Sequence, residues 1–187
     1  MREIGLKSYS ALWLLMWLLP ATALSDDFKI SGFGARLLDG AYVVDAVIEY
    51  HFSDEALDAL QNGVPLTLEM HLQLRRDRAW IWEPDLVDVR LRYQLRHRAL
   101  TGLYQVIDMQ TAGKQSFATR GAALMALGTL SRVPLIRREN LRSGESYRVS
   151  LRSTLDIEAL PLPLRPMAYL TSAWNLSSDR VTWYLKP

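Results

Sequence analysis

Polar and apolar residues alternate along several stretches of the chain, as expected when one face of a strand packs on a core and the other faces water. The alternation is most regular in residues 66–75, where every second residue is apolar. The same pattern recurs at 42–52, 87–98 and 147–157, and in shorter form at 103–109, 116–118 and 180–185. It predicts four half-buried strands and three shorter ones.

Two connections between these stretches carry the signals of a helix. Ser53 and Thr119 each precede a run of helix-forming residues, and a hydroxyl at that position caps the first free N–H groups of a helix. We therefore expect short helices at 54–62 and 120–130.

Strands that follow one another so closely are typical of an antiparallel sheet, because parallel strands need long crossover connections. One polar and one apolar face per strand is the pattern of two sheets packed together. No internal repeat, low-complexity segment or domain linker interrupts it. The sequence predicts a mainly β, antiparallel β-sandwich-like single domain with two or three short helices.

Three prolines follow the last of the long strands, in a segment that stays apolar. Pro161 ends the strand because proline has no N–H for a sheet ladder, and Pro166 suits the first turn of a short helix. We expect the leucines, Met167 and Tyr169 to pack as a lid over one open end of the core. The alternative is an exposed groove of proline and aromatic residues, beside Trp174, for a peptide or membrane partner.

The N-terminus has the three-part layout of a secretory signal. Arg2 and Lys7 precede an apolar run at 11–19, and small residues then lead to a cleavage site after Ala23. The run is about half the roughly 20 residues that span a bilayer, so a cleaved signal peptide at 1–23 is preferred to an uncleaved anchor. No later segment is long and apolar enough to cross a membrane. We expect a periplasmic domain over 24–187.

Composition narrows the chemistry further. The chain has no cysteine, which excludes disulfides, thiol catalysis and a lipoprotein anchor. It has 22 basic and 20 acidic residues, and removal of Arg2, Lys7 and Glu3 with the signal leaves 20 and 19. An exported protein is not expected to bind nucleic acid. The motifs of serine hydrolases, P-loop enzymes and zinc proteases are missing from the sequence, so we predict no catalytic residue and no cofactor.

Two Glu-x-His motifs lie on consecutive predicted strands. Glu49 and His51 share the polar face of one strand, and Glu69 and His71 share that of the next. If the two strands pair, their four side chains converge as ligands for zinc or manganese. The alternative is a solvated polar face with ordinary cross-strand pairs.

Arginines gather on the polar faces of two strands and before a pair of tryptophans. They are Arg75, Arg76, Arg78, Arg90, Arg92, Arg96, Arg98, Arg148 and Arg152. If these strands are neighbours, their guanidinium groups form a ladder that attracts phosphate, acidic lipid head groups or acidic protein segments. The balance of charge instead favours cross-strand pairs with carboxylates. The candidate carboxylates are Glu49, Glu69, Asp156 and Glu158.

Trp80 and Trp82 bracket one residue in the connection between two predicted strands. They either cover an end of the sandwich or anchor a partner, since tryptophan and arginine are enriched at binding hot spots. The predicted partner-binding residues are Trp80, Trp82, Arg90, Arg92, Arg96 and Arg98.

Three segments carry a resemblance to a known family: NGVPLTLEMHLQL, RLRYQLRHRALTGLYQV and GESYRVSLRSTLDIEALPLPLRPMAYLTSAWNLSSDRVTW. They resemble the exported proteobacterial proteins grouped as domain of unknown function 4390, over roughly residues 28–183. The resemblance implies an exported location and no established activity. It also implies genes that often lie beside a membrane histidine kinase of nitrogen-regulator type.

Two functional interpretations follow. The first is a periplasmic, non-enzymatic binding or accessory protein with a membrane or envelope protein as partner, such as a sensor kinase in envelope signalling. The alternative is a metal-dependent or carboxylate-based hydrolase that acts on an envelope substrate. A third interpretation is a structural protein whose arginines and tryptophans are all satisfied internally.

Overall fold

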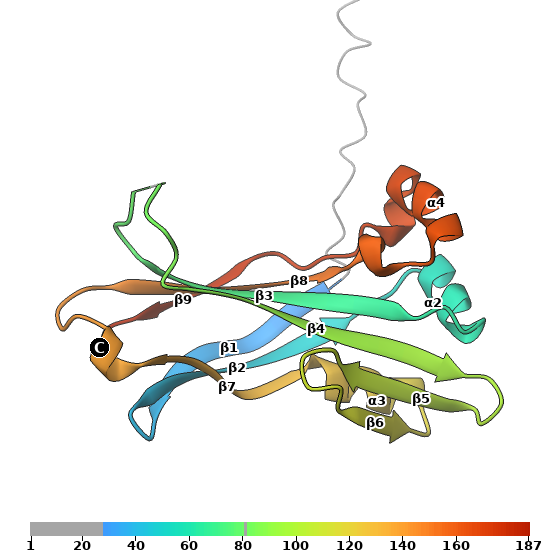
Figure 1. Cartoon of the computed structure of the whole chain (residues 1–187), viewed down its shortest axis with the longest axis horizontal. Coiled ribbons are helices and arrows are strands. Elements are labelled where there is room, and N and C mark those ends of the chain that lie inside the picture. Colours follow the sequence, from blue (N-terminus) through green and yellow to red (C-terminus); the bar gives the residue numbers. More distant parts are fainter. Residues whose placement is uncertain (1–27, 81) are drawn as a thin grey trace, which may run out of the picture.

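The computed structural model describes residues 28–80 and 82–187, and the predicted signal peptide lies outside this part of the chain. Two antiparallel sheets face each other, and short helices lie at the ends and edges of the sandwich (Figure 1). The mainly β fold that the alternation predicts is confirmed. Within the described residues, no helix is long and apolar enough to cross a membrane.

The smaller sheet has three strands in the order β1-β2-β7. These strands are β1 (Phe28–Leu38), β2 (Ala41–Tyr50) and β7 (Thr129–Arg137). A tight turn joins β1 to β2, and its residues Asp39 and Gly40 have φ angles of 48° and 79°. Two successive residues with positive φ are typical of a type I′ turn, whose twist matches that of the strands it joins.

The larger sheet has six strands in the order β6-β5-β4-β3-β8-β9. They are β3 (Leu66–Arg76), β4 (Val87–Arg98), β5 (Leu103–Asp108), β6 (Lys114–Phe117), β8 (Tyr147–Leu155) and β9 (Val181–Leu185). β3 lies at the centre, where it pairs antiparallel with β4 and β8. Leu66, Leu68, Met70, Leu72 and Leu74 of β3 are all buried, as the alternation predicts.

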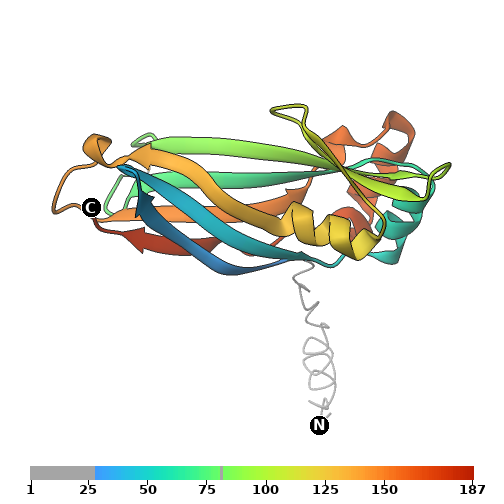
Figure 2. The same ribbon diagram turned by 90° about the horizontal axis from the view of Figure 1, so that it is seen from below.

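The apolar faces of the two sheets form one core. Figure 2 shows the smaller sheet lying in front of the larger one. Phe28 on β1 packs edge-on against Tyr50 on β2, with 4.8 Å between ring centroids, and the Tyr50 hydroxyl lies 3.3 Å from Ser153 Oγ on β8. These contacts join the two sheets at one end of the sandwich.

Two helices lie in connections between strands of different sheets. Helix α2 (Asp54–Gln61) begins where the Ser53 hydroxyl accepts a hydrogen bond from Ala56 N, as predicted. Helix α3 (Arg120–Gly128) is capped by Thr119 and lies between β2 and the β5–β6 edge. Its predicted end at residue 130 is wrong, because Thr129 already begins β7.

Strands β1 and β7 have no counterpart among the predicted strands. Two glycines, Gly32 and Gly34, interrupt the apolar pattern of β1, and Pro134 lies inside β7. Proline is tolerated there because β7 lies at the edge of its sheet and pairs only with β2.

The proline-rich segment forms a series of short turns before β9. It contains the 3-10 turns Ile157–Ala159, Leu162–Leu164 and Ser172–Trp174, with helix α4 (Arg165–Leu170) among them. Pro166 lies in the first turn of α4, as predicted. We call residues 157–174 the C-terminal cap.

The predicted lid over the core is only partly correct. Leu160, Ala168 and Trp174 are buried, but Met167 and Tyr169 are 61% and 60% exposed. A helix of six residues can bury one side only, so the remaining apolar side chains face outward. Because Trp174 is itself buried, it lines no exposed groove, and the alternative prediction is wrong on that point.

Candidate functional site

The polar side of the larger sheet carries Arg90 and Arg92, two of the six residues predicted to bind a partner. Because alternate residues of each strand point into the core, the others form one surface, which we call the outer face. It comprises Glu69, His71, Gln73 and Arg75 on β3, Asp88, Arg90 and Arg92 on β4, and Arg148 and Arg152 on β8. The register places Arg92 opposite Glu69 and Arg90 opposite His71.

Glu69 holds two of the four arginines of β4 in place. Arg90 Nη1 lies 2.9 Å from Glu69 Oε1, and Arg92 Nη2 lies 2.9 Å from Glu69 Oε2. The hydrogen bond that Arg92 donates to Glu69 and the nearby charge of Asp156 raise the pKa of the Arg92 guanidinium above its usual value. The predicted cross-strand pairing is therefore confirmed for Arg90 and Arg92, with Glu69 and Asp156 as the carboxylates.

These ion pairs are layered. The side chain of Glu69 is only 13% exposed, whereas those of Arg90 and Arg92 are 59% and 51% exposed. The carboxylate therefore lies beneath the guanidinium groups. Each guanidinium carries five N–H donors, more than one buried carboxylate can use. The groups exposed to solvent here are therefore mainly cationic, although carboxylates beneath them offset the charge of the two arginines.

A second network continues along the outer face. His71 Nε2 lies 2.7 Å from Asp88 Oδ1, and this hydrogen bond lowers the pKa of Asp88. Gln73 Nε2 donates to Asp85 Oδ2 at 2.8 Å, and Arg180 donates to Gln73 Oε1 at 2.5 Å. These bonds link β4, β3 and the approach to β9.

The other arginines do not extend this surface into a continuous ladder. Strand β3 separates β4 from β8, so Glu69, His71 and Gln73 lie between the arginines of the two strands. Arg96 donates to Gln94 Oε1 at 2.6 Å, and Arg98 ends β4 beside the turn to β5. The condition for a guanidinium ladder, that β4 and β8 are direct neighbours, is therefore not met.

Trp80 and Trp82 lie on the connection between β3 and β4, whose described residues 77–80 and 82–86 we call the tryptophan loop. Their rings stack with centroids 5.3 Å apart and planes 12° from parallel. They are 68% and 79% exposed, so they do not cover an end of the sandwich. Figure 1 shows the loop rising from the sheet at the end opposite α4.

Arginines fix the base of the tryptophan loop. Arg75 Nη2 donates to the carbonyl oxygens of Trp80 and Glu83, at 2.9 and 2.8 Å. Arg76 pairs with Glu83 at 3.0 Å, and Arg148 on β8 pairs with Asp77 at 2.8 Å. The sequence places Arg75 and Arg76 near the tryptophans, but it carries no signal that Arg75 binds loop carbonyls, because those bonds depend on the path of the backbone.

The two Glu-x-His motifs lie on different sheets. β2, which contains Glu49, pairs with β1 and β7, whereas β3 with Glu69 and His71 pairs with β4 and β8. The strand pairing on which the predicted metal site depends is therefore wrong, because α2 carries the chain from one sheet to the other. In residues 28–80 and 82–187, no three His, Asp or Glu side chains are grouped closely enough to hold a metal ion.

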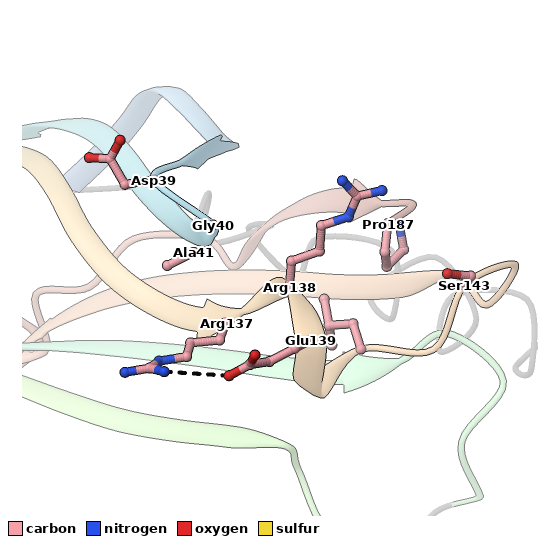
Figure 3. Close-up of a pocket in the computed structure, with 9 residues that line it drawn as sticks. Asp39, Gly40, Ala41, Arg137, Arg138, Glu139, Ser143 and Pro187 are labelled. Carbon is pink, nitrogen blue, oxygen red and sulfur yellow. Dashed lines mark hydrogen bonds and ion pairs between the residues drawn. The ribbon is translucent and has the colours of Figure 1, made fainter.

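A hollow of about 840 Å³ lies at the opposite end of the sandwich from α4 (Figure 3). The β1–β2 turn, the end of β7 and Pro187 line it. Its one drawn ion pair joins Arg137 and Glu139 at 3.4 Å, and both side chains are at least 70% exposed. The hollow contains none of the predicted site residues.

The comparisons with known proteins agree with the resemblance seen in the sequence. A family profile described as Domain of unknown function (DUF4390) matches residues 25–184. Neither the curated proteins nor the solved structures gave a match. Because the profile covers both sheets and the C-terminal cap, the chain belongs to the DUF4390 family.

Proposed function

We propose that this protein is an exported, non-enzymatic accessory module that binds a membrane protein of the cell envelope. The contact is made by the tryptophan loop and by Arg90 and Arg92 of the outer face. One observation carries the proposal: two stacked tryptophans stand in solvent on a loop that three arginines hold in place.

The geometry of the loop suits an anchor. Large apolar side chains in water are unfavourable, and a stacked pair of indoles offers one broad apolar surface. Tryptophan dominates many binding hot spots because it buries a large area with few rotatable bonds. Because Arg75, Arg76 and Arg148 already order the loop, binding loses little further conformational entropy.

The cationic layer of the outer face indicates the chemistry of the partner. Arg90 and Arg92 present their unused N–H donors outward, above the buried carboxylate of Glu69. Guanidinium groups in this position form bidentate bonds with carboxylates. The partner therefore presents both an acidic segment and an apolar site that receives the indoles.

The cellular setting rests on the sequence. The signal layout of residues 1–23 supports export, and an exported location is also what the resemblance to the DUF4390 family implies. The membrane histidine kinases often encoded beside this family make the external part of a sensor kinase the preferred partner.

A crosslinking pull-down from intact envelopes tests the proposal. Wild type and Leu100→Ala, a control at a fully exposed leucine in the β4–β5 turn, capture the same membrane protein. The double variant Trp80→Ala/Trp82→Ala reduces capture by about tenfold or more. Arg90→Glu/Arg92→Glu also reduces capture. The reduction is larger at low salt than at high salt, because salt screens exposed charges.

Equal capture by wild type and the double tryptophan variant would contradict the proposal. So would one zinc or manganese ion per purified chain that is lost on Glu69→Gln or His71→Ala substitution, because that result would indicate a metal-dependent activity.

A further inference from the structure

The C-terminal cap presents a second apolar surface. Leu162, Met167, Tyr169 and Leu170 are 73%, 61%, 60% and 83% exposed, and we call them the apolar patch. Single exposed apolar residues are common on protein surfaces, but four on one short segment mark a contact surface. We propose that the apolar patch lies on the surface of a lipid bilayer that contains anionic head groups.

The patch stands on a fixed base. Leu160 and Ala168 are 1% exposed beneath it, and Arg165 Nε donates to the carbonyl oxygen of Leu160 at 2.9 Å. The Tyr169 hydroxyl donates a hydrogen bond to Glu158, and Thr171 N donates one to the Met167 carbonyl oxygen at 3.1 Å. The exposed side chains are therefore projections on a folded cap. Projections of this kind enter a deformable surface, whereas a rigid protein partner would need a matching groove.

Cations lie where lipid head groups would meet the cap. Tyr169 shares a small hollow with three carboxylates, Glu69, Asp156 and Glu158, and with the guanidinium groups of Arg90 and Arg92. Glu69 and Asp156, which pair with these arginines, are only 13% and 12% exposed, whereas the two guanidinium side chains are 59% and 51% exposed. Phosphate oxygens of anionic lipids accept hydrogen bonds from arginine, and tyrosine favours the interface between head groups and acyl chains.

The chain outside the described residues enters at this end of the molecule. Phe28 N donates to Ser177 O at 3.4 Å, and Phe28 forms a bridge with Ser178, close to the C-terminal cap. Eight residues, 20–27, separate the apolar run at 11–19 from Phe28. Eight residues span at most about 30 Å. Before the signal is cleaved, a membrane that holds this run therefore lies within reach of the cap.

The arrangement also orients the tryptophan loop. Figure 1 shows α4 and the loop rising from the same side of the molecule, at opposite ends. A membrane that touches the apolar patch therefore faces the loop as well. If the proposed function holds, this orientation places the acidic segment of the partner close to the membrane surface, and to that extent it rests on the proposed function.

Vesicle flotation tests the bilayer contact without any partner protein. The exported protein is mixed with vesicles of phosphatidylglycerol and phosphatidylethanolamine. Wild type and the control Leu100→Gln/Met125→Gln, which alters two side chains elsewhere that are 103% and 71% exposed, float with the vesicles. Leu162→Gln/Met167→Gln/Leu170→Gln reduces the partition coefficient by about tenfold or more, because binding strength follows the buried apolar area.

A fluorescent label reports the contact directly. Because the chain has no cysteine, Leu170→Cys and Met125→Cys each provide a single attachment site for an environment-sensitive dye. Added vesicles shift the emission to the blue at residue 170 and leave it unchanged at residue 125. An unchanged emission at residue 170 would overturn the inference, as would flotation of the triple glutamine variant at the wild-type level.

The two proposals fail separately. Loss of envelope crosslinks in the triple glutamine variant, together with a wild type that does not bind pure vesicles, would assign the patch to a protein partner and overturn the bilayer contact. Vesicle binding by Trp80→Ala/Trp82→Ala at the wild-type level, with its protein partner lost, supports both proposals.

Discussion

The carboxylate of Asp45 on β2 contacts both neighbouring strands of the smaller sheet, one oxygen on each side. Oδ2 lies 2.7 Å from Arg36 Nε on β1, and Oδ1 accepts a hydrogen bond from Arg132 N on β7 at 2.8 Å. Arg132 has a φ angle of 53°, and the register between β2 and β7 shifts beside Asp45. The carboxylate thus satisfies an N–H group that the irregular ladder leaves free.

These contacts predict how stability depends on pH. The hydrogen bond from Arg36, followed by that from Arg132 N, lowers the pKa of Asp45 below its usual value. A lowered folded-state pKa adds stability above the unfolded value of about 4, and this stability is lost as the pH falls through the folded-state pKa. We expect the difference in unfolding free energy between wild type and Asp45→Asn to be largest at neutral pH and to shrink below about pH 4. Urea titrations from pH 2 to 7 measure it, and a difference that stays constant with pH would contradict the assignment.

Among the elements, α3 packs against β2 through its last residue. A Cβ atom on Gly128 would lie 2.0 Å from the carbonyl oxygen of Ile48, which is backbone and cannot swing away. We expect Gly128→Ala to lower the free energy of unfolding by at least about 2 kcal/mol, the cost of an overpacked contact.

Gly121 provides the matched control in the same helix, because a Cβ atom there meets nothing within 4 Å. Gly121→Ala is expected to be neutral or to stabilise the protein by up to about 1 kcal/mol. Denaturant unfolding of both variants checks the pair, and similar losses of stability in the two would show that the contact with Ile48 is not the cause.

The elements also show how far sequence reasoning reaches. The strict alternation of β3 predicted its buried leucines, because a strand with one face in the core must repeat every two residues. β7 was missed because Thr129 follows a helical run directly and Pro134 is a poor strand residue. Its place in the fold depends on pairing with β2, a contact between distant parts of the chain that no local pattern reports.

The same limit applies to the candidate site. The pairing of Arg90 and Arg92 with Glu69 could be predicted, because alternation and adjacency of β3 and β4 suffice for it. The separation of the two Glu-x-His motifs could not, because which sheet a strand joins is decided by packing of the whole core. The exposure of Met167 and Tyr169 could not be predicted either, since an apolar composition does not say which side of a short helix is buried.

For the whole molecule, the outer face, the tryptophan loop and the apolar patch lie on the same side. The tryptophan loop lies at one end, the apolar patch at the other, and the cationic layer of Arg90 and Arg92 lies beside the patch. The smaller sheet is on the opposite side and supports them through the shared core. In the two proposals, this arrangement is a rigid platform that presents one side to the membrane and to a protein within it.

The most direct test of this account is photo-crosslinking in living cells from a reactive residue at position 82, with position 125 as the control. Both native side chains are more than 70% exposed, at 79% and 71%, so neither replacement disturbs the core. The account predicts one specific crosslinked membrane protein from position 82 and none from position 125. No crosslink from position 82, or the same products from both positions, would contradict it.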